Sequence, residues 1–182
     1  MSLVIGSDLQ DIIVTGEEND LIFGLDGNDD ISGGAGDDDI IGGKGRDTLS
    51  GGEGNDTLFG GVPGGQPMPG DNPDTVDFLF GGDGDDLLVS GNSSAVLSGG
   101  DGLDTLVGGA GVDDFFSDVN DLGGPDVVQN FHVGTDQLII SGASSDSVVT
   151  YDAETGIVSV NGEALFQLDP GLDVDSDDYT IL

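Results

Sequence analysis

Aspartates recur in this sequence at intervals of nine residues, and carboxylates at a fixed spacing can bind metal ions or transfer protons. Between Gly33 and Phe59 the sequence reads GGAGDDDII, GGKGRDTLS and GGEGNDTLF, three units without an insertion. Each unit has glycine at positions one, two and four, aspartate at position six and an aliphatic residue at position eight. A short fixed period of this kind dictates the architecture of a chain. The chemistry of the aspartates therefore depends on how the units stack.

The same register extends from Gly6 to Phe116. Complete units begin at Gly33, Gly42, Gly51, Gly81, Gly99 and Gly108, and the remaining units are degenerate. The aspartates at position six are Asp11, Asp20, Asp29, Asp38, Asp47, Asp56, Asp77, Asp86, Asp104 and Asp113. Ala95 stands where one aspartate is expected, and a proline-rich excursion at 60–71 interrupts the register. Both features weaken the prediction of a site beside them.

Position eight tests this register, because a solvated repeat would not keep one column apolar. The eleven residues there are Ile13, Ile22, Ile31, Ile40, Leu49, Leu58, Leu79, Leu88, Leu97, Leu106 and Phe115. The last three residues of each unit alternate as a strand does, so this column faces one side. The first six, GGxGxD, form a turn, since glycine permits positive φ and a close approach of carbonyl groups. Two units then complete one coil, with parallel strands about 4.8 Å apart.

Stacked coils place aspartates 18 residues apart next to each other, where bare carboxylates repel. A hard divalent cation between the loops reverses that repulsion. Calcium takes about 6–8 oxygen ligands from carboxylates and carbonyls, whereas magnesium demands octahedral geometry and keeps its water. Zinc and copper prefer nitrogen or sulfur, and the chain has no cysteine and one histidine. The repeat therefore predicts calcium binding.

The composition supports a chain that folds only when a cation neutralises it. The 182 residues include 37 acidic residues, all but five of them aspartate, against Lys44 and Arg46, for a net charge of −35. Self-repulsion of this size opposes a compact state. It also argues against nucleic-acid partners and anionic membrane surfaces, which require lysine and arginine. There is no run of about 18 apolar residues for membrane insertion and no recognisable amino-terminal signal peptide.

Tandem GGxGxDxUx units resemble the calcium-binding RTX nonapeptide repeat. The resemblance covers about residues 6–116 and implies an all-β, right-handed parallel β-roll over 1–116. It also implies that the ten aspartates bind about six to nine Ca²⁺ ions between successive coils. The carbonyl ligands that it implies come from Gly27, Gly34, Gly36, Gly43, Gly45, Gly52, Gly54, Gly82, Gly84, Gly100, Gly102, Gly109 and Gly111.

Residues 117–182 lack the repeat and are expected to form a C-terminal β cap. Short apolar runs predict strands near 126–131, 137–140, 148–151, 157–160, 164–168 and 179–182, and Asn161-Gly162 predicts a two-residue hairpin. This segment resembles the flank that follows such repeats in secreted bacterial proteins. In that family the flank caps the roll, and its end carries an uncleaved signal for the type I secretion machinery. The last six residues, from Asp177 to Leu182, fit either that signal or a final strand.

No catalytic motif emerges. The sequence has no HExxH, no GxSxG and no cysteine, and His132 is more consistent with a structural or surface role. We therefore expect a secreted, extracellular, non-catalytic module that folds on calcium binding after export. The alternatives are an adhesive, self-associating surface module and the C-terminal domain of a larger secreted toxin, protease or lipase.

A further expectation concerns the outward side chains at position nine. If the 60–71 excursion counts as half a coil, one face carries Phe23, Ile41, Phe59 and Phe80. An aromatic stripe is unlikely to be left in contact with water. The C-terminal segment or a second copy of the chain is therefore expected to cover this face.

Overall fold

The computed structural model describes residues 1–61, 75–144 and 146–182, and all regular elements in these ranges are strands. In the repeat region the strands are β1 (Leu3–Ile5), β2 (Ile12–Val14), β3 (Leu21–Asp26), β4 (Asp30–Ala35), β5 (Asp39–Lys44), β6 (Thr48–Glu53), β7 (Thr57–Phe59), β8 (Val76–Asp83), β9 (Leu87–Val89), β10 (Ser94–Asp101), β11 (Thr105–Val107) and β12 (Asp113–Asp118). They are followed by β13 (Asp126–Gln129), β14 (Gln137–Ser141), β15 (Val149–Asp152), β16 (Ile157–Val160), β17 (Glu163–Gln167) and β18 (Tyr179–Ile181). The search for a helix long and apolar enough to cross a membrane found none in these ranges.

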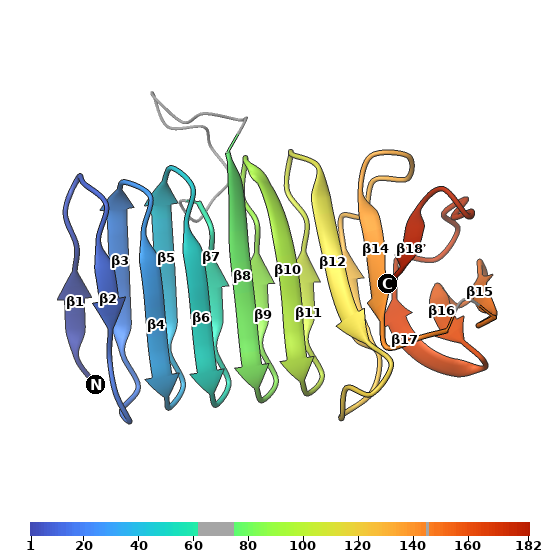
Figure 1. Ribbon diagram of the computed structural model, residues 1–182, viewed down its shortest axis with the longest axis horizontal. Helices are drawn as coiled ribbons and strands as arrows, with labels where there is room; N and C mark the ends of the chain where they lie inside the picture. Colours follow the sequence, from blue (N-terminus) through green and yellow to red (C-terminus); the bar gives the residue numbers. More distant parts are fainter. Residues whose placement is uncertain (62–74, 145) are drawn as a thin grey trace.

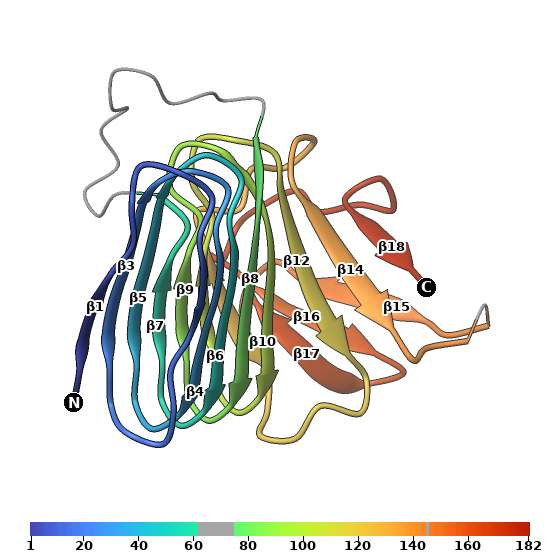
Figure 2. The same ribbon diagram turned by 60° about the vertical axis from the view of Figure 1, so that its left-hand side comes forward.

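Successive strands alternate between two facing sheets, as Figures 1 and 2 show. One sheet has the order β1-β3-β5-β7-β9-β11-β13-β17-β16-β15, and the other has the order β18-β14-β12-β10-β8-β6-β4-β2. From β1 to β14 every pair of neighbours is parallel and keeps position eight in register, as in Leu49↔Leu79 and Leu58↔Leu88. The predicted parallel β-roll is confirmed.

The position-eight column fills the space between the two sheets. From Ile22 to Phe115 its members are at most 1% exposed, and they form one hydrophobic cluster. Ile13 is only half-buried, because it lies in the first coil, next to the open end of the roll. Beyond the repeat, Val128 and Leu138 extend the same column at 1% and 0% exposure.

Several strands are longer than the three residues that the repeat predicts. In β4, β5 and β6 the ladder continues through the glycine pair, as the partners Gly34↔Gly52 show. The reason is the close stacking of identical coils, which lets a glycine with positive φ stay paired with its counterpart one coil away. The irregular part of the turn is therefore shorter than six residues.

The expected aromatic face is wrong, because Phe80 lies on the opposite sheet from Phe23, Ile41 and Phe59. Phe59 pairs with Val89, whereas Phe80 pairs with Ser50 and Ser98. Because β8 pairs with β6 and β9 pairs with β7, β8 is the next strand after β7 in the alternation between the two sheets. Residues 62–71 of the predicted excursion at 60–71 lie outside the described ranges, so the structure gives no account of the loop itself.

The C-terminal segment builds directly onto both sheets. Strands β13 and β14 pair in parallel with β11 and β12, and β17 and β18 follow them. An antiparallel meander of β15, β16 and β17 ends the larger sheet. The predicted hairpin is confirmed, since Asn161 and Gly162 have φ of 54° and 90° and join paired strands. A division of the chain at residue 116 stays a prediction.

Candidate metal centre

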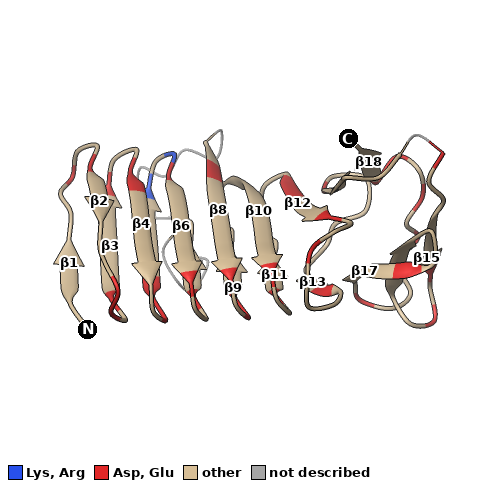
Figure 3. Cartoon of the chain, turned by 60° about the horizontal axis from the view of Figure 1, so that its bottom comes forward, with Lys and Arg blue, Asp and Glu red and all other residues tan. Residues whose placement is uncertain are grey.

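The position-six aspartates lie in two rows, one along each edge of the roll, where Figure 3 shows acidic residues at the ends of the strands. We call them ladder A and ladder B. Ladder A precedes strands of the ten-stranded sheet and contains Asp20, Asp38, Asp56, Asp86 and Asp104. Ladder B lies just before, or within the first two residues of, strands of the eight-stranded sheet and contains Asp11, Asp29, Asp47, Asp77 and Asp113. The structure thus brings the ten predicted aspartates together as two sets.

Hydrogen bonds connect each row from coil to coil. In ladder A the backbone N–H of Asp38 donates to Oδ1 of Asp56 at 2.7 Å, and that of Asp56 donates to Oδ1 of Asp86 at 2.7 Å. In ladder B the N–H of Asp29 donates to Oδ1 of Asp47 at 2.9 Å. One oxygen of each carboxylate is thereby fixed, and the other remains for a different partner.

That second oxygen is what marks a metal site. In six of the aspartates Oδ2 is buried and has no hydrogen-bond partner: Asp29, Asp38, Asp47, Asp56, Asp86 and Asp104. A buried carboxylate oxygen without a donor is costly, because it has lost its water and gained nothing in exchange. A bound cation removes this cost. The unpaired oxygens are therefore where calcium fits the residues present.

Backbone carbonyl oxygens of the glycine-rich turns lie close to the neighbouring coils. A Cβ atom on Gly52 would overlap the carbonyl oxygen of Gly34 one coil earlier, and one on Gly54 would overlap that of Gly36. These oxygens thus point toward the next coil at van der Waals contact, which only glycine tolerates. All the predicted glycines except Gly109 and Gly111 have positive φ, and a Cβ on either of these two would also meet backbone atoms of the preceding coil.

Burial makes most of the ladder aspartates difficult to ionise without a cation, whereas the hydrogen bond from the N–H of Ser2 lowers the pKa of Asp20. Except for Asp11, every predicted aspartate is at most 4% exposed. Burial raises the pKa of Asp47 and of Asp86 to about 7, and that of Asp56 to about 6. Neighbouring carboxylates add to the rise, which is the expected response of like charges brought together out of water. A divalent cation would reverse both effects.

Ladder B is interrupted where Ala95 replaces aspartate. Ser93 Oγ donates to Oδ2 of Asp77 at 2.9 Å, so this oxygen already has a partner. The N–H of Ala95 donates to Oδ1 of Asp113 at 3.0 Å, and the N–H of Gly109 donates to its Oδ2 at 2.8 Å. Protein donors satisfy both carboxylates here, so this stretch of ladder B does not have the unpaired oxygens found elsewhere.

Two residues that sequence reasoning missed extend the ladders past the repeat. Asp126 accepts a hydrogen bond from the N–H of Asp104 at 3.2 Å, and Asp136 accepts one from the N–H of Asp113 at 3.1 Å. The signal in the sequence is an aspartate two residues before a buried apolar residue, Val128 or Leu138. His132, expected to have a structural or surface role, donates its backbone N–H to Oδ2 of Asp136 at 2.8 Å.

Within the described ranges, no group of three or more His, Cys, Asp or Glu side chains is placed to hold a metal ion. The aspartates and the backbone carbonyls of these loops offer oxygen donors alone, as hard cations such as calcium prefer.

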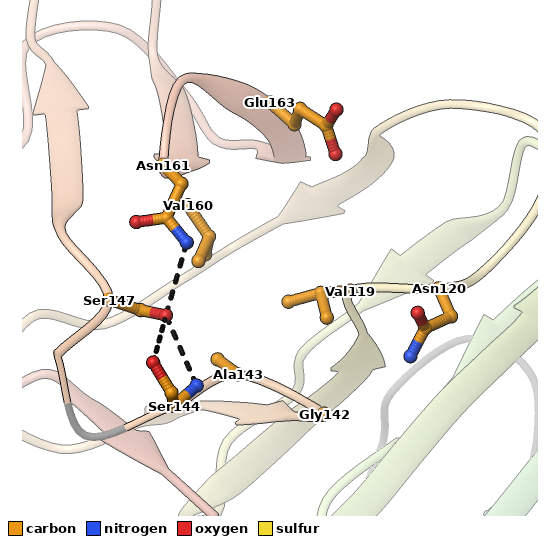
Figure 4. A pocket seen from close by; sticks show the side chains of 9 residues that line it. All are labelled: Val119, Asn120, Gly142, Ala143, Ser144, Ser147, Val160, Asn161 and Glu163. Atoms are coloured by element: carbon orange, nitrogen blue, oxygen red, sulfur yellow. Dashed lines mark hydrogen bonds between the residues drawn. The ribbon is translucent and has the colours of Figure 1, made fainter.

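A cavity of about 360 Å³ lies apart from the ladders, between the roll and the C-terminal meander (Figure 4). Val119, Asn120, Gly142, Ala143, Ser144, Ser147, Val160, Asn161 and Glu163 line it. Ser147 Oγ accepts hydrogen bonds at 3.1 Å from the N–H of Ser144 and from Nδ2 of Asn161. Glu163 is the only titratable residue among these lining residues, so the described wall of the cavity offers no pair of groups for acid–base catalysis.

A parallel roll edged by buried aspartates and glycine carbonyls defines a metal-binding β-solenoid. The model of the RTX calcium-binding nonapeptide repeat matches in four copies, at residues 5–40, 32–62, 76–94 and 91–121. These matches cover more than half of the sequence, and the chain belongs to this family.

Comparison with solved structures finds a similarity to the extracellular lipase LipA from Serratia marcescens. The two are 21% identical, with a TM-score of 0.44, over 99% of this chain and 40% of that chain. The present chain thus spans two fifths of the length of that lipase. No curated protein matches the sequence.

Proposed function

We propose that this chain is a non-catalytic module of a secreted bacterial protein that binds several calcium ions and folds on binding them. The observation that carries the proposal is the set of six buried Oδ2 atoms without a hydrogen-bond partner. They occur in consecutive coils, beside carbonyl oxygens held close by glycine. Each of these oxygens lacks a partner, and carboxylate oxygens are ligands that calcium prefers.

The binding residues in this proposal are the aspartates of both ladders together with the carbonyls of the predicted glycines. Ladder A offers four unpaired oxygens, from Asp38 to Asp104, and ladder B offers two, on Asp29 and Asp47. About six to nine ions would be accommodated, with two carboxylates shared by neighbouring loops and the remaining ligands from carbonyls. The ion supplies the positive charge that the chain lacks.

Folding is coupled to binding because the roll is electrostatically unfavourable without cations. The net charge is −35, and the ladder carboxylates are buried within it. A ligand that binds only the folded state stabilises it by about RT ln(1 + [L]/Kd) per site. Extracellular calcium sites have Kd of about 10⁻⁴–10⁻³ M. Such sites stay empty at the low calcium concentration of a cytoplasm and fill outside the cell.

The decisive experiment is a calcium titration of the whole chain followed by circular dichroism. We expect a cooperative gain of β signal that EGTA reverses, because each filled site orders the loops on which the next site depends. Magnesium at the same concentration is the matched control and should give little change, since it does not readily shed its water. A chain that is fully folded in EGTA and unaffected by calcium would contradict the proposal.

Export is the second part of the proposal. The resemblance of residues 117–182 to the flanks of type I secretion substrates supports it. The end of the chain forms β18, which pairs with β14 through Leu138↔Tyr179. A segment that is a strand in the folded roll is still free to act as a signal before calcium is available. Deletion of residues 177–182 should abolish export through a reconstituted type I system, and unchanged export would contradict this part.

A further inference from the structure

Asp126 lies in the position that continues ladder A, five residues beyond the last residue matched by the repeat family. Its Oδ1 accepts a hydrogen bond from the N–H of Asp104 at 3.2 Å, and the N–H of Val127 donates to the carbonyl of Asp104 at 2.8 Å. The same two bonds connect the previous coils, where Asp86 donates to Oδ1 of Asp104 at 2.8 Å and Thr105 donates to the carbonyl of Asp86 at 2.8 Å. Asp126 is 3% exposed.

The loop before Asp126 also reproduces the close approach of carbonyl groups. A Cβ atom on Gly123 would overlap the carbonyl oxygen of Gly102, as one on Gly102 would overlap that of Gly84. Gly123 and Gly102 have φ of 133° and 155°. The N–H of Leu122 donates to Oδ1 of Asp101 at 3.1 Å, which fixes the start of the loop to the coil before it. The junction therefore presents the oxygen-rich surroundings of a repeat site without the repeat sequence.

One carboxylate oxygen at this junction is not satisfied by the protein. Oδ2 of Asp104 is buried and has no hydrogen-bond partner. Asp126 is buried beside it, so two carboxylates lie close together out of contact with water.

The corresponding end of ladder B is different. Asp136 accepts the N–H of Asp113 on Oδ1 at 3.1 Å and the N–H of His132 on Oδ2 at 2.8 Å. Backbone donors therefore hold both oxygens, and this end of the ladder is complete without an ion. The C-terminal ends of the two ladders are thus closed in different ways.

We propose that Asp104 and Asp126 together bind a further calcium ion at the junction between the repeat and the C-terminal strands. This proposal rests on the function proposed above. Because Asp126 begins β13, which pairs with both β11 and β17, the ion ties the terminal meander to the roll. Asp136 is a structural residue that binds no ion.

Calcium counting on purified, calcium-saturated protein tests the assignment. Asp126→Asn retains an oxygen acceptor for the N–H of Asp104 but removes the charge, so we expect one ion fewer than in the wild type by native mass spectrometry. Asp136→Asn is the matched control and should keep the full count. Asp104→Asn combined with Asp126→Asn should lose no more ions than Asp104→Asn alone does, because the two residues share the site. An unchanged count in Asp126→Asn, or an equal loss in Asp136→Asn, would overturn the assignment.

Hydrogen exchange of the wild type gives a readout that needs no variant. The amides of β13 should gain protection at the same calcium concentration as those of β11. Protection of β13 that is already present in EGTA would refute the junction site. A wild-type chain that binds no calcium at all would instead refute the function proposed for the whole roll, so the two failures are distinguishable.

Discussion

At the scale of single residues, the roll depends on backbone conformations that only glycine adopts freely, and Leu25 is an exception. It occupies position two of its unit with φ of 86°, where the equivalent Gly43 has φ of 118°. Its side chain is 39% exposed, so little core packing repays the strain. Such a conformation costs a residue with a Cβ atom about 1–2 kcal/mol.

Leu25→Gly should therefore stabilise the calcium-loaded protein by about 0.5–1 kcal/mol, since relief of strain exceeds the extra backbone entropy of glycine. Urea unfolding at saturating calcium measures the change. The reciprocal control, Gly43→Leu, should destabilise by about 3 kcal/mol, because its Cβ would overlap the carbonyl oxygen of Leu25. A destabilised Leu25→Gly variant would show that the leucine side chain makes a packing contribution larger than its strain.

Single residues also show how far the sequence predicts the site. The ten aspartates could be found because each is followed two residues later by a core side chain at a constant spacing. Asp126 and Asp136 escape that search, since they follow Asp104 and Asp113 by 22 and 23 residues instead of 18. The additional residues form turns outside the two sheets, and no nine-residue pattern registers them. Which carboxylate oxygens lack a donor depends on three-dimensional packing alone.

At the scale of elements, the loop before β10 is connected to its neighbouring coils by hydrogen bonds that need no metal ion. The hydroxyl of Ser93 and the N–H groups of Ala95 and Gly109 donate hydrogen bonds to the ladder B carboxylates, which are therefore satisfied without an ion. Ladder B is therefore divided into an N-terminal part with unpaired oxygens and a C-terminal part without them. Ladder A runs on without such a division.

Ser93→Gly combined with Ala95→Asp should restore the missing site. It recreates glycine at position four and aspartate at position six, and it frees Oδ2 of Asp77. We expect at least one additional calcium ion in isothermal titration calorimetry relative to the wild type. Ser93→Ala is the control, which frees the same oxygen without adding a carboxylate and should gain no ion. A double variant with the wild-type count would mean that the carbonyl groups of this loop are misplaced for binding.

The arrangement of faces shows what an element-level prediction lacked. The repeat frame identified every strand from β2 to β12, yet it placed Phe80 on the wrong sheet. The sheet to which a strand belongs depends on its place in the alternation, and residue numbers alone do not give that place across an insertion. Only the pairing of β6 with β8 and of β7 with β9 shows that β8, and with it Phe80, belongs to the eight-stranded sheet.

At the scale of the whole molecule, buried carboxylates make stability depend on pH. Burial raises the pKa of Asp47 and Asp86 from 3.8 to about 7, and that of Asp126 to about 8. Between these values the folded, calcium-free roll holds protons that the unfolded chain has released. Its stability is therefore unaffected by these groups below about pH 4 and falls as pH rises through about 4 to 8.

Calcium must displace the same protons, so its apparent affinity should rise with pH over the upper part of this window. We expect the midpoint of the circular dichroism titration to move to higher calcium concentration as the pH is lowered from about 8 to about 6. In EGTA, the β signal should be stronger near pH 5 than near pH 8. Asp47→Asn should weaken both dependences, whereas Asp152→Asn, which is far from the ladders, should not. A midpoint that is independent of pH would contradict the burial of charged carboxylates.

The aspartate ladders have a direction. In every link the backbone N–H belongs to the earlier coil and the accepting carboxylate belongs to the later one. The amide of a ladder aspartate is therefore satisfied only when the next coil is in place, whereas the amide of the residue after it donates to the coil before, as from Thr105 to the carbonyl of Asp86. A chain that emerges with its C-terminal end first would present each accepting carboxylate before the aspartate amide that needs it. A chain that emerges with its N-terminal end first would present each of these amides before its carboxylate.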